Sequence, residues 1–132
     1  MIIVKSPREI ELMREAGRIT GSVFDALQPY LKPGVTTEEL DRVAEKTIRS
    51  QNATPGFKGY GGFPATCCIS VNDTLVHGFP SKYRLKEGDI VSVDVGAVYK
   101  GYNGDAARTF AIGKISDNAA KLIRVTEECF WL

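Results

Sequence analysis

Apolar residues near the start of the chain recur at helical spacing. The segment Ser6-Pro7-Arg8-Glu9 has the form of a capping box with proline at the first helical position, so a helix is predicted to begin here. Its buried stripe is expected to be Ile10, Met13, Gly17, Thr20, Phe24 and Leu27, spaced by threes and fours. Pro29 is expected to kink the last turn, and the helix should end before Lys32-Pro33-Gly34.

A second capping box predicts a second amphipathic helix. Thr36 is followed by Glu39 at the required spacing. The apolar positions that follow share one helical face and comprise Leu40, Val43, Ala44, Thr47 and Ile48. Two helices are therefore expected before any strand.

The next stretch, residues 54–64, combines closely spaced glycines with aromatic residues. Glycine at this density opposes a stable helix, so the stretch is predicted to be a loop with large side chains. Loops of this kind often line a binding site, because a rigid scaffold holds them at its edge. A plain packed connector fits the same pattern, and the composition alone does not decide between the two.

Three later segments have the pattern of strands, and a final segment has that of a helix. Residues 66–71, 90–98 and 102–112 are rich in β-branched or aromatic residues and are separated by turn residues, which predicts three antiparallel strands. Ser116 is placed to cap a helix. Its apolar positions are Leu122, Ile123, Val125, Cys129 and Phe130. The fold class expected is therefore α+β, in one domain over residues 1–132.

Composition and charge narrow the function classes. Seventeen basic residues face sixteen acidic ones, so the chain has no basic field to attract nucleic acid or an anionic membrane. The start of the chain has no apolar export signal, and no apolar run approaches the length that spans a bilayer. A cytoplasmic protein is expected. Cys67, Cys68 and Cys129 form no metal-binding spacing and are expected to be reduced, mostly structural thiols.

Two aspartates on neighbouring strands are the main chemical feature of the sequence. Asp94 lies in an apolar, β-branched run, and Asp105 lies in the strand that follows a short turn. A two-residue turn allows two registers, in which Asp105 faces either Asp94 or Gly96. Both registers put the two carboxylates on one face of the sheet. Two carboxylates at such a short distance repel each other unless a cation lies between them. A divalent metal site is therefore predicted, with one or two metal ions.

Structural roles for the same residues fit the spacing as well. One aspartate could cap a turn while the other forms an ion pair with Arg108 or Lys100. His77 is the only histidine in the chain, and a lone histidine often has a purely structural role. The spacing of these residues does not by itself choose between structure and catalysis.

The sequence contains six motif stretches, which are residues 32–37, 59–64, 68–73, 76–80, 88–94 and 101–105. In this order and spacing they resemble type I methionine aminopeptidases of the pita-bread fold family. The resemblance covers nearly the whole chain. It implies half of a pita-bread fold, with two N-terminal helices, a curved antiparallel sheet of about three strands and a C-terminal helix. Prolidase-like members of the wider family share the metal aspartates but usually lack the second and fourth stretches together.

The resemblance also implies a role for each matching residue. Asp94 corresponds to the bidentate ligand of one metal and Asp105 to the carboxylate that bridges two. His77 corresponds to the catalytic histidine that contacts the substrate. Further positions would bind the methionine side chain (Phe57, Tyr60 and Phe63) and, through backbone oxygen, a monovalent cation (Asn72). The metal implied is cobalt, manganese, iron, zinc or magnesium, and the substrate is the N-terminal methionine of nascent peptides.

The chain has about half the length expected of such an enzyme. The resemblance implies that one histidine and two glutamate ligands, together with a second catalytic histidine, come from the other half. We therefore expect the 132-residue chain alone to have little or no peptidase activity. A non-catalytic half-domain is the alternative: it would form a homodimer through the exposed face that the missing half normally covers, and it would bind metal between the two copies. A truncated product without a role of its own is a third interpretation.

Overall fold

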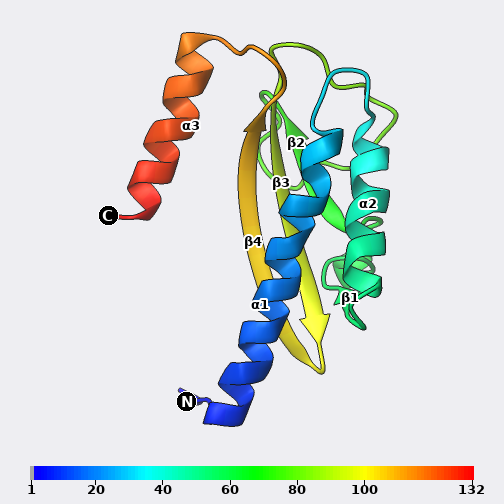
Figure 1. Cartoon of the computed structure of the whole chain (residues 1–132), viewed down its shortest axis with the longest axis vertical. Helices are drawn as coiled ribbons and strands as arrows, with labels where there is room; N and C mark the ends of the chain where they lie inside the picture. Colours follow the sequence, from blue (N-terminus) through cyan, green and yellow to red (C-terminus); the bar gives the residue numbers. More distant parts are fainter. Residues whose placement is uncertain (1) are drawn as a thin grey trace.

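The structure is a computed structural model that describes residues 2–132, and it contains three α-helices and one antiparallel sheet (Figure 1). The helices are α1 (Pro7–Leu27), α2 (Thr37–Arg49) and α3 (Asp117–Phe130). The strands are β1 (Thr54–Pro55), β2 (Cys67–Val71), β3 (Ile90–Tyr99) and β4 (Tyr102–Ala111), and two short 3-10 turns, η1 (Gln28–Tyr30) and η2 (Tyr60–Gly62), complete the described elements. This arrangement confirms the predicted α+β class. None of the described helices is long and apolar enough to cross a membrane.

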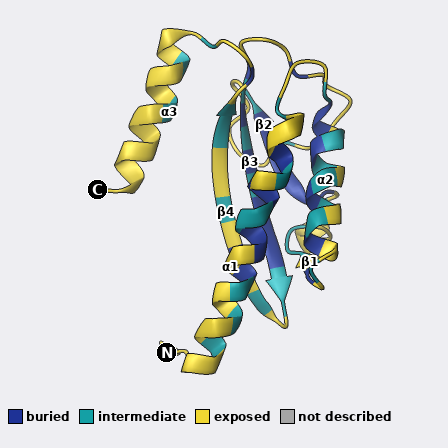
Figure 2. Cartoon of the chain, in the orientation of Figure 1, coloured by how far each residue is buried: buried dark blue, intermediate teal, exposed yellow. Residues whose placement is uncertain are grey.

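The sheet is centred on β3, which pairs along its whole length with β4. Both β2 and the short β1 pair with β3 as well, so they follow one another along its other edge. Helices α1 and α2 lie side by side on one face of this sheet (Figure 1). The buried residues gather between these helices and the sheet, and no helix of residues 2–132 packs on the opposite face (Figure 2).

Both predicted capping boxes are present. Ser6 accepts a hydrogen bond from the backbone of Glu9, Thr36 accepts one from Glu39, and each glutamate accepts one in return from its N-cap residue. Pro29 does not kink an α-helix, because α1 ends at Leu27 and the chain continues as η1. Capping therefore sets the start of both helices as the sequence predicted.

The buried stripe of α1 was predicted correctly only in its second half. Thr20, Phe24 and Leu27 are buried, but the earlier positions Ile10, Met13 and Gly17 are exposed. The residues buried instead are Ala16, Ile19 and Val23. The first turns of α1 extend past the end of the sheet (Figure 1), and Ile10 and Met13 there are 45% and 39% exposed. On α2 the prediction is better, since Leu40, Ala44 and Ile48 are fully buried.

Two further features differ from the sequence interpretation. The stretch 54–64 is not loop throughout, because Thr54 and Pro55 pair with Val98 and Ala97 and add a short fourth strand. Helix α3 starts at the predicted cap, Ser116, but none of its residues is buried. It stands apart from the two-layer body (Figure 1). The structure thus consists of a sheet packed against α1 and α2, and of α3, which has no packing partner among the described residues.

Candidate metal-binding face

The β3–β4 hairpin positions the two aspartates. Its turn is Lys100-Gly101, and both residues have positive φ (48° and 86°), which matches the right-handed twist of the flanking strands. The register pairs Asp105 with Gly96, and Asp94 with Ala107. Of the two registers that the sequence left open, the structure therefore has the one that offsets the aspartates by two positions along one face.

Asp94 is in an environment that disfavours its negative charge. The pKa of Asp94 is raised, first by burial and then by the neighbouring charge of Asp105, while His77 acts in the opposite direction. Its Oδ1 atom is buried and has no hydrogen-bond partner among residues 2–132. A buried carboxylate oxygen without a donor, next to a second carboxylate, is a suitable ligand for a hard divalent cation.

The competing interpretation, an ion pair with Arg108 or Lys100, is wrong in this structure. The Arg108 guanidinium lies 5.1 Å from the ring centre of Phe24, on the helix side of the sheet, and Lys100 Nζ lies 5.1 Å from that of Tyr99. Within the described part of the chain neither residue forms an ion pair with an aspartate. The same part contains no cluster of three or more histidine, cysteine or carboxylate groups that could hold a metal.

His77 lies on the loop between β2 and β3, beside the edge of β2. Its side chain is exposed, and it is near enough to Asp94 to lower the pKa of that carboxyl. Its backbone has φ of 52°, and that of Val76 has φ of 44°. Two successive non-glycine residues in the left-handed region are uncommon and require surrounding contacts to hold them.

The three aromatic residues expected to line a substrate pocket differ in position. Phe57 lies over the open face, since a Cβ atom added to Gly96 would be 2.8 Å from its ring. Phe63 makes an edge-on contact with Phe79, with ring centres 5.3 Å apart. Tyr60 is 83% exposed. Phe57 therefore lies against Gly96, the cross-strand partner of Asp105.

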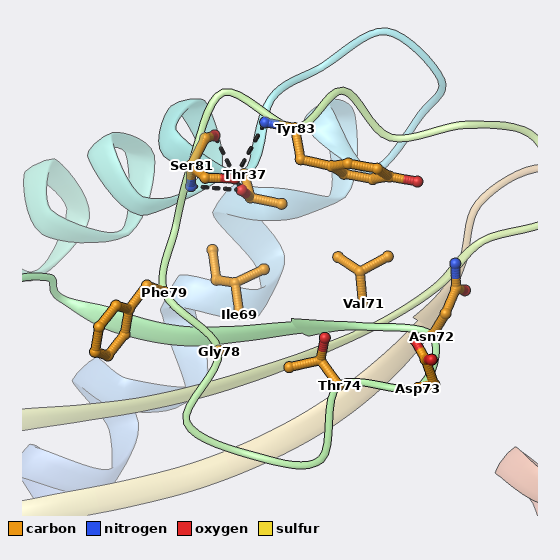
Figure 3. A pocket seen from close by; sticks show the side chains of 10 residues that line it. All are labelled: Thr37, Ile69, Val71, Asn72, Asp73, Thr74, Gly78, Phe79, Ser81 and Tyr83. Carbon is orange, nitrogen blue, oxygen red and sulfur yellow. Dashed lines mark hydrogen bonds between the residues drawn. The ribbon is translucent and has the colours of Figure 1, made fainter.

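Asn72 is held at the end of β2 by its own hydrogen bonds. Its side chain donates to Asp89 and accepts from the backbone of Ile90, and its φ is 54°. It borders a cavity of about 350 Å³ between β2, the start of α2 and the loop that follows β2 (Figure 3). Ile69 and Val71 point from β2 toward Thr37 and Tyr83 across this cavity (Figure 3). Strand alternation puts Ile69 and Val71 on the face opposite to that of the aspartates, so this cavity is separate from the candidate metal site.

Cys68 is a neighbour of the site that the sequence interpretation did not assign to it. It pairs directly with Asp94, and burial, followed by the charges of Asp94 and Asp105, raises the pKa of its thiol. The adjacent Cys67 points into the core. All three cysteines are free. The alternation of neighbouring residues in a strand was the signal that could have identified Cys68, once β2 was placed beside β3.

Comparisons with known proteins point to one family. Residues 11–131 match the sequence model of metallopeptidase family M24. The methionine aminopeptidase of Clostridium acetobutylicum is 61% identical over 132 residues, which cover 99% of this chain and 53% of that protein. Methionine aminopeptidase 1 of Bacillus subtilis is 52% identical over 131 residues, with the same coverage of 99% and 53%.

The fold has a similar relative among solved structures. The crystal structure of methionine aminopeptidase from Thermotoga maritima superposes with a TM-score of 0.94 at 43% identity, covering 97% of this chain and 52% of that one. The chain thus spans about half the length of the curated relatives it matches.

Proposed function

Because the chain belongs to metallopeptidase family M24, we propose that it supplies one half of the metal and substrate site of an enzyme that removes N-terminal methionine from nascent peptides. The observation that carries this proposal is the pair of carboxylates on the open face, with an unpartnered buried oxygen on Asp94. A cytoplasmic location is part of the same proposal.

Each site residue has a specific role in this proposal. Asp94 and Asp105 bind divalent metal, which when bound would polarise the peptide carbonyl and activate water. His77, exposed beside them, would donate a hydrogen bond to charge that develops on the substrate. Phe57 covers the floor of the site at Gly96, and its apolar ring suits a methionine side chain.

The other aromatic residues and the monovalent cation have more distant roles in the proposal. Tyr60 and Phe63 would extend the pocket for methionine from the η2 turn. The backbone oxygen of Asn72 would bind a monovalent cation, since its side chain is already engaged by Asp89 and Ile90. The metal would be cobalt, manganese, iron, zinc or magnesium, because carboxylate oxygens accept each of them.

Calorimetric titration with Mn²⁺ tests the metal site directly. We expect weak binding by the 132-residue chain, because two carboxylates supply fewer protein ligands than a transition metal usually takes. Asp94→Asn and Asp105→Asn should each abolish the binding heat. Asp25→Asn is the matched control, since Asp25 is an exposed aspartate on α1, and it should leave binding unchanged. Equal heats for all four proteins would refute the site.

A peptidase assay tests how much of the enzyme the chain contains. With Mn²⁺ or Co²⁺ and a methionyl tripeptide, we expect little or no turnover by this chain, because no glutamate of the described residues lies beside the aspartates to act as a general base. Turnover comparable to that of full-length relatives would contradict this part of the proposal while leaving the metal assignment in place.

Self-association is a second candidate function, and the exposed side chains of α3 favour it. Leu122 and Phe130 of α3, and Trp131 directly after it, are 59%, 78% and 76% exposed. Apolar residues in such numbers on one helix usually have a covering partner. A second copy of the chain would bury them and bring two pairs of aspartates into one assembly. Light scattering at increasing concentration is the test, and a particle that stays monomeric would exclude this function.

A further inference from the structure

The loop that carries His77 is attached to the edge of β2 at Gly78, the residue that follows His77. The backbone N–H of Ile69 donates to the carbonyl of Gly78 at 2.8 Å. The N–H of Gly78 in turn donates to the Ser70 hydroxyl at 3.1 Å. Together these two bonds hold the loop along the edge of β2 that faces away from β3.

Only glycine allows this close approach. A Cβ atom at Gly78 would lie 2.3 Å from the carbonyl oxygen of Ile69 and 2.9 Å from Cα of Ser70. The two residues before it, Val76 and His77, have positive φ. Left-handed backbone at a β-branched residue persists only where neighbouring contacts impose it. The attachment at Gly78 is such a contact, because it fixes the end of the strained segment.

Ser70 is well placed to control this attachment. It is 4% exposed and pairs with Ser92 in the β2–β3 register, two positions from the pair formed by Cys68 and Asp94. Its side chain therefore lies on the same face as Asp94. The hydroxyl connects the sheet that holds the aspartates to the residue that follows His77.

We propose that Ser70 is a positioning residue, whose hydroxyl holds the Gly78 amide and thereby sets the imidazole of His77 beside the Asp94–Asp105 pair. The structural part of this inference stands on the hydrogen bonds and the backbone conformation. Its functional part rests on the proposed metal site. Loss of the Ser70 hydroxyl should therefore displace His77 while leaving the two aspartates in place.

His77 is the only histidine, so its imidazole Hε1 signal in an NMR spectrum has no competitor. Mn²⁺ bound at the aspartates should strongly broaden this signal in the unaltered chain. In Ser70→Ala we expect clearly less broadening at His77 at the same Mn²⁺ occupancy, with unchanged broadening of the Asp94 and Asp105 amides. Ser70→Thr keeps a hydroxyl and should restore the effect. Ser92→Ala is the matched control, because the Ser92 hydroxyl bonds to Thr109 and not to the loop.

Two readouts need no metal and separate this inference from the proposed function. With Ser70 present, Asp94→Asn should shift the His77 Hε1 signal. In the Ser70→Ala background the same substitution should not shift it. The Gly78 amide should exchange slowly with solvent in the unaltered chain and in Ser92→Ala, and faster in Ser70→Ala. If Mn²⁺ broadens no signal near Asp94, the metal site is refuted, and these two readouts still decide the role of Ser70.

An unchanged His77 response in folded Ser70→Ala would overturn the inference. If that variant does not fold, the hydrogen-exchange rate of the Gly78 amide in the unaltered chain tests the inference instead. Exchange as fast as that of the exposed loop residue Asp73 would overturn the inference, and slow exchange together with intact Mn²⁺ broadening in Ser70→Thr would support it.

Discussion

The two faces of the sheet are built from the same strands but have opposite properties. On the helix side, Val91, Val93 and Val95 of β3 are fully buried. On the open side, the intervening Ser92 and Asp94 are only partly buried. Because side chains alternate along a strand, one face of β3 contributes its side chains to the core and the other contributes them to the candidate site. Substitutions on the two faces should therefore have separable effects.

The largest effect is expected from Phe24 on the helix side. It is 2% exposed and packs against Phe110 and Arg108. Phe24→Ala should lower the free energy of unfolding by about 3–5 kcal/mol, because it removes a large buried side chain and leaves a cavity. Urea denaturation measures this loss.

Phe130→Ala is the matched control for that prediction. Phe130 lies on α3 and is 78% exposed, so its loss should change stability by no more than about 0.5 kcal/mol. Similar losses for the two phenylalanines would show that α3 is packed in solution. That result would break the contrast between the buried and the uncovered parts of the molecule.

An intermediate effect is expected where α1 approaches β4. A Cβ atom at Gly104 would lie 2.5 Å from the Ala16 carbonyl oxygen, so Gly104→Ala should cost about 1–3 kcal/mol by forcing the helix away from the sheet. Gly17→Ala is the control, because its added Cβ would have no atom within 4 Å apart from the backbone of α1 around it. It should stabilise the chain by about 0.5–1 kcal/mol through helix propensity. Thermal unfolding distinguishes the two, and destabilisation by Gly17→Ala would support the stripe that the sequence predicted.

Of the three main substitutions, the one expected to change stability least is at Asp94, on the open face. Without metal, Asp94→Asn should stabilise the chain by about 1 kcal/mol at neutral pH, because an amide can donate to Asp105 where a carboxylate repels it. With Mn²⁺ the order should reverse, since only the unaltered chain gains stability from binding. Melting temperatures with and without Mn²⁺ measure both effects.

The pH dependence of the same variant follows from the raised pKa of Asp94. The folded chain holds this proton more tightly than the unfolded chain, so the stability it contributes is present below the ordinary aspartate pKa of about 4 and is lost as pH rises through the folded value. The advantage of Asp94→Asn in metal-free buffer should therefore shrink toward zero as the pH falls below about 4. An advantage that stays constant with pH would mean that Asp94 carries no unfavourable charge.

The sequence and the structure agree most closely on local features and differ where distant segments meet. The three N-caps, Ser6, Thr36 and Ser116, were identified because each depends on residues only three positions away. The exposed start of α1 and the short strand β1 were missed. Both depend on how far the sheet extends, and a local sequence pattern carries no information about that length.

The candidate site divides in the same way. A shared face for Asp94 and Asp105 followed from strand alternation and a short turn, since both allowed registers place them together. The choice of register, the neighbourhood of Cys68 and the attachment of the His77 loop to Ser70 required the folded chain.

Alternation, capping and turn length are properties of adjacent residues, so the sequence by itself determined the helix starts, the hairpin and the common face of the aspartates. Pairing between β2 and β3 and the contact of Gly78 with β2 join segments that are separate in the chain. Their geometry follows from packing and hydrogen bonding across the whole domain, and only the tertiary structure decided it.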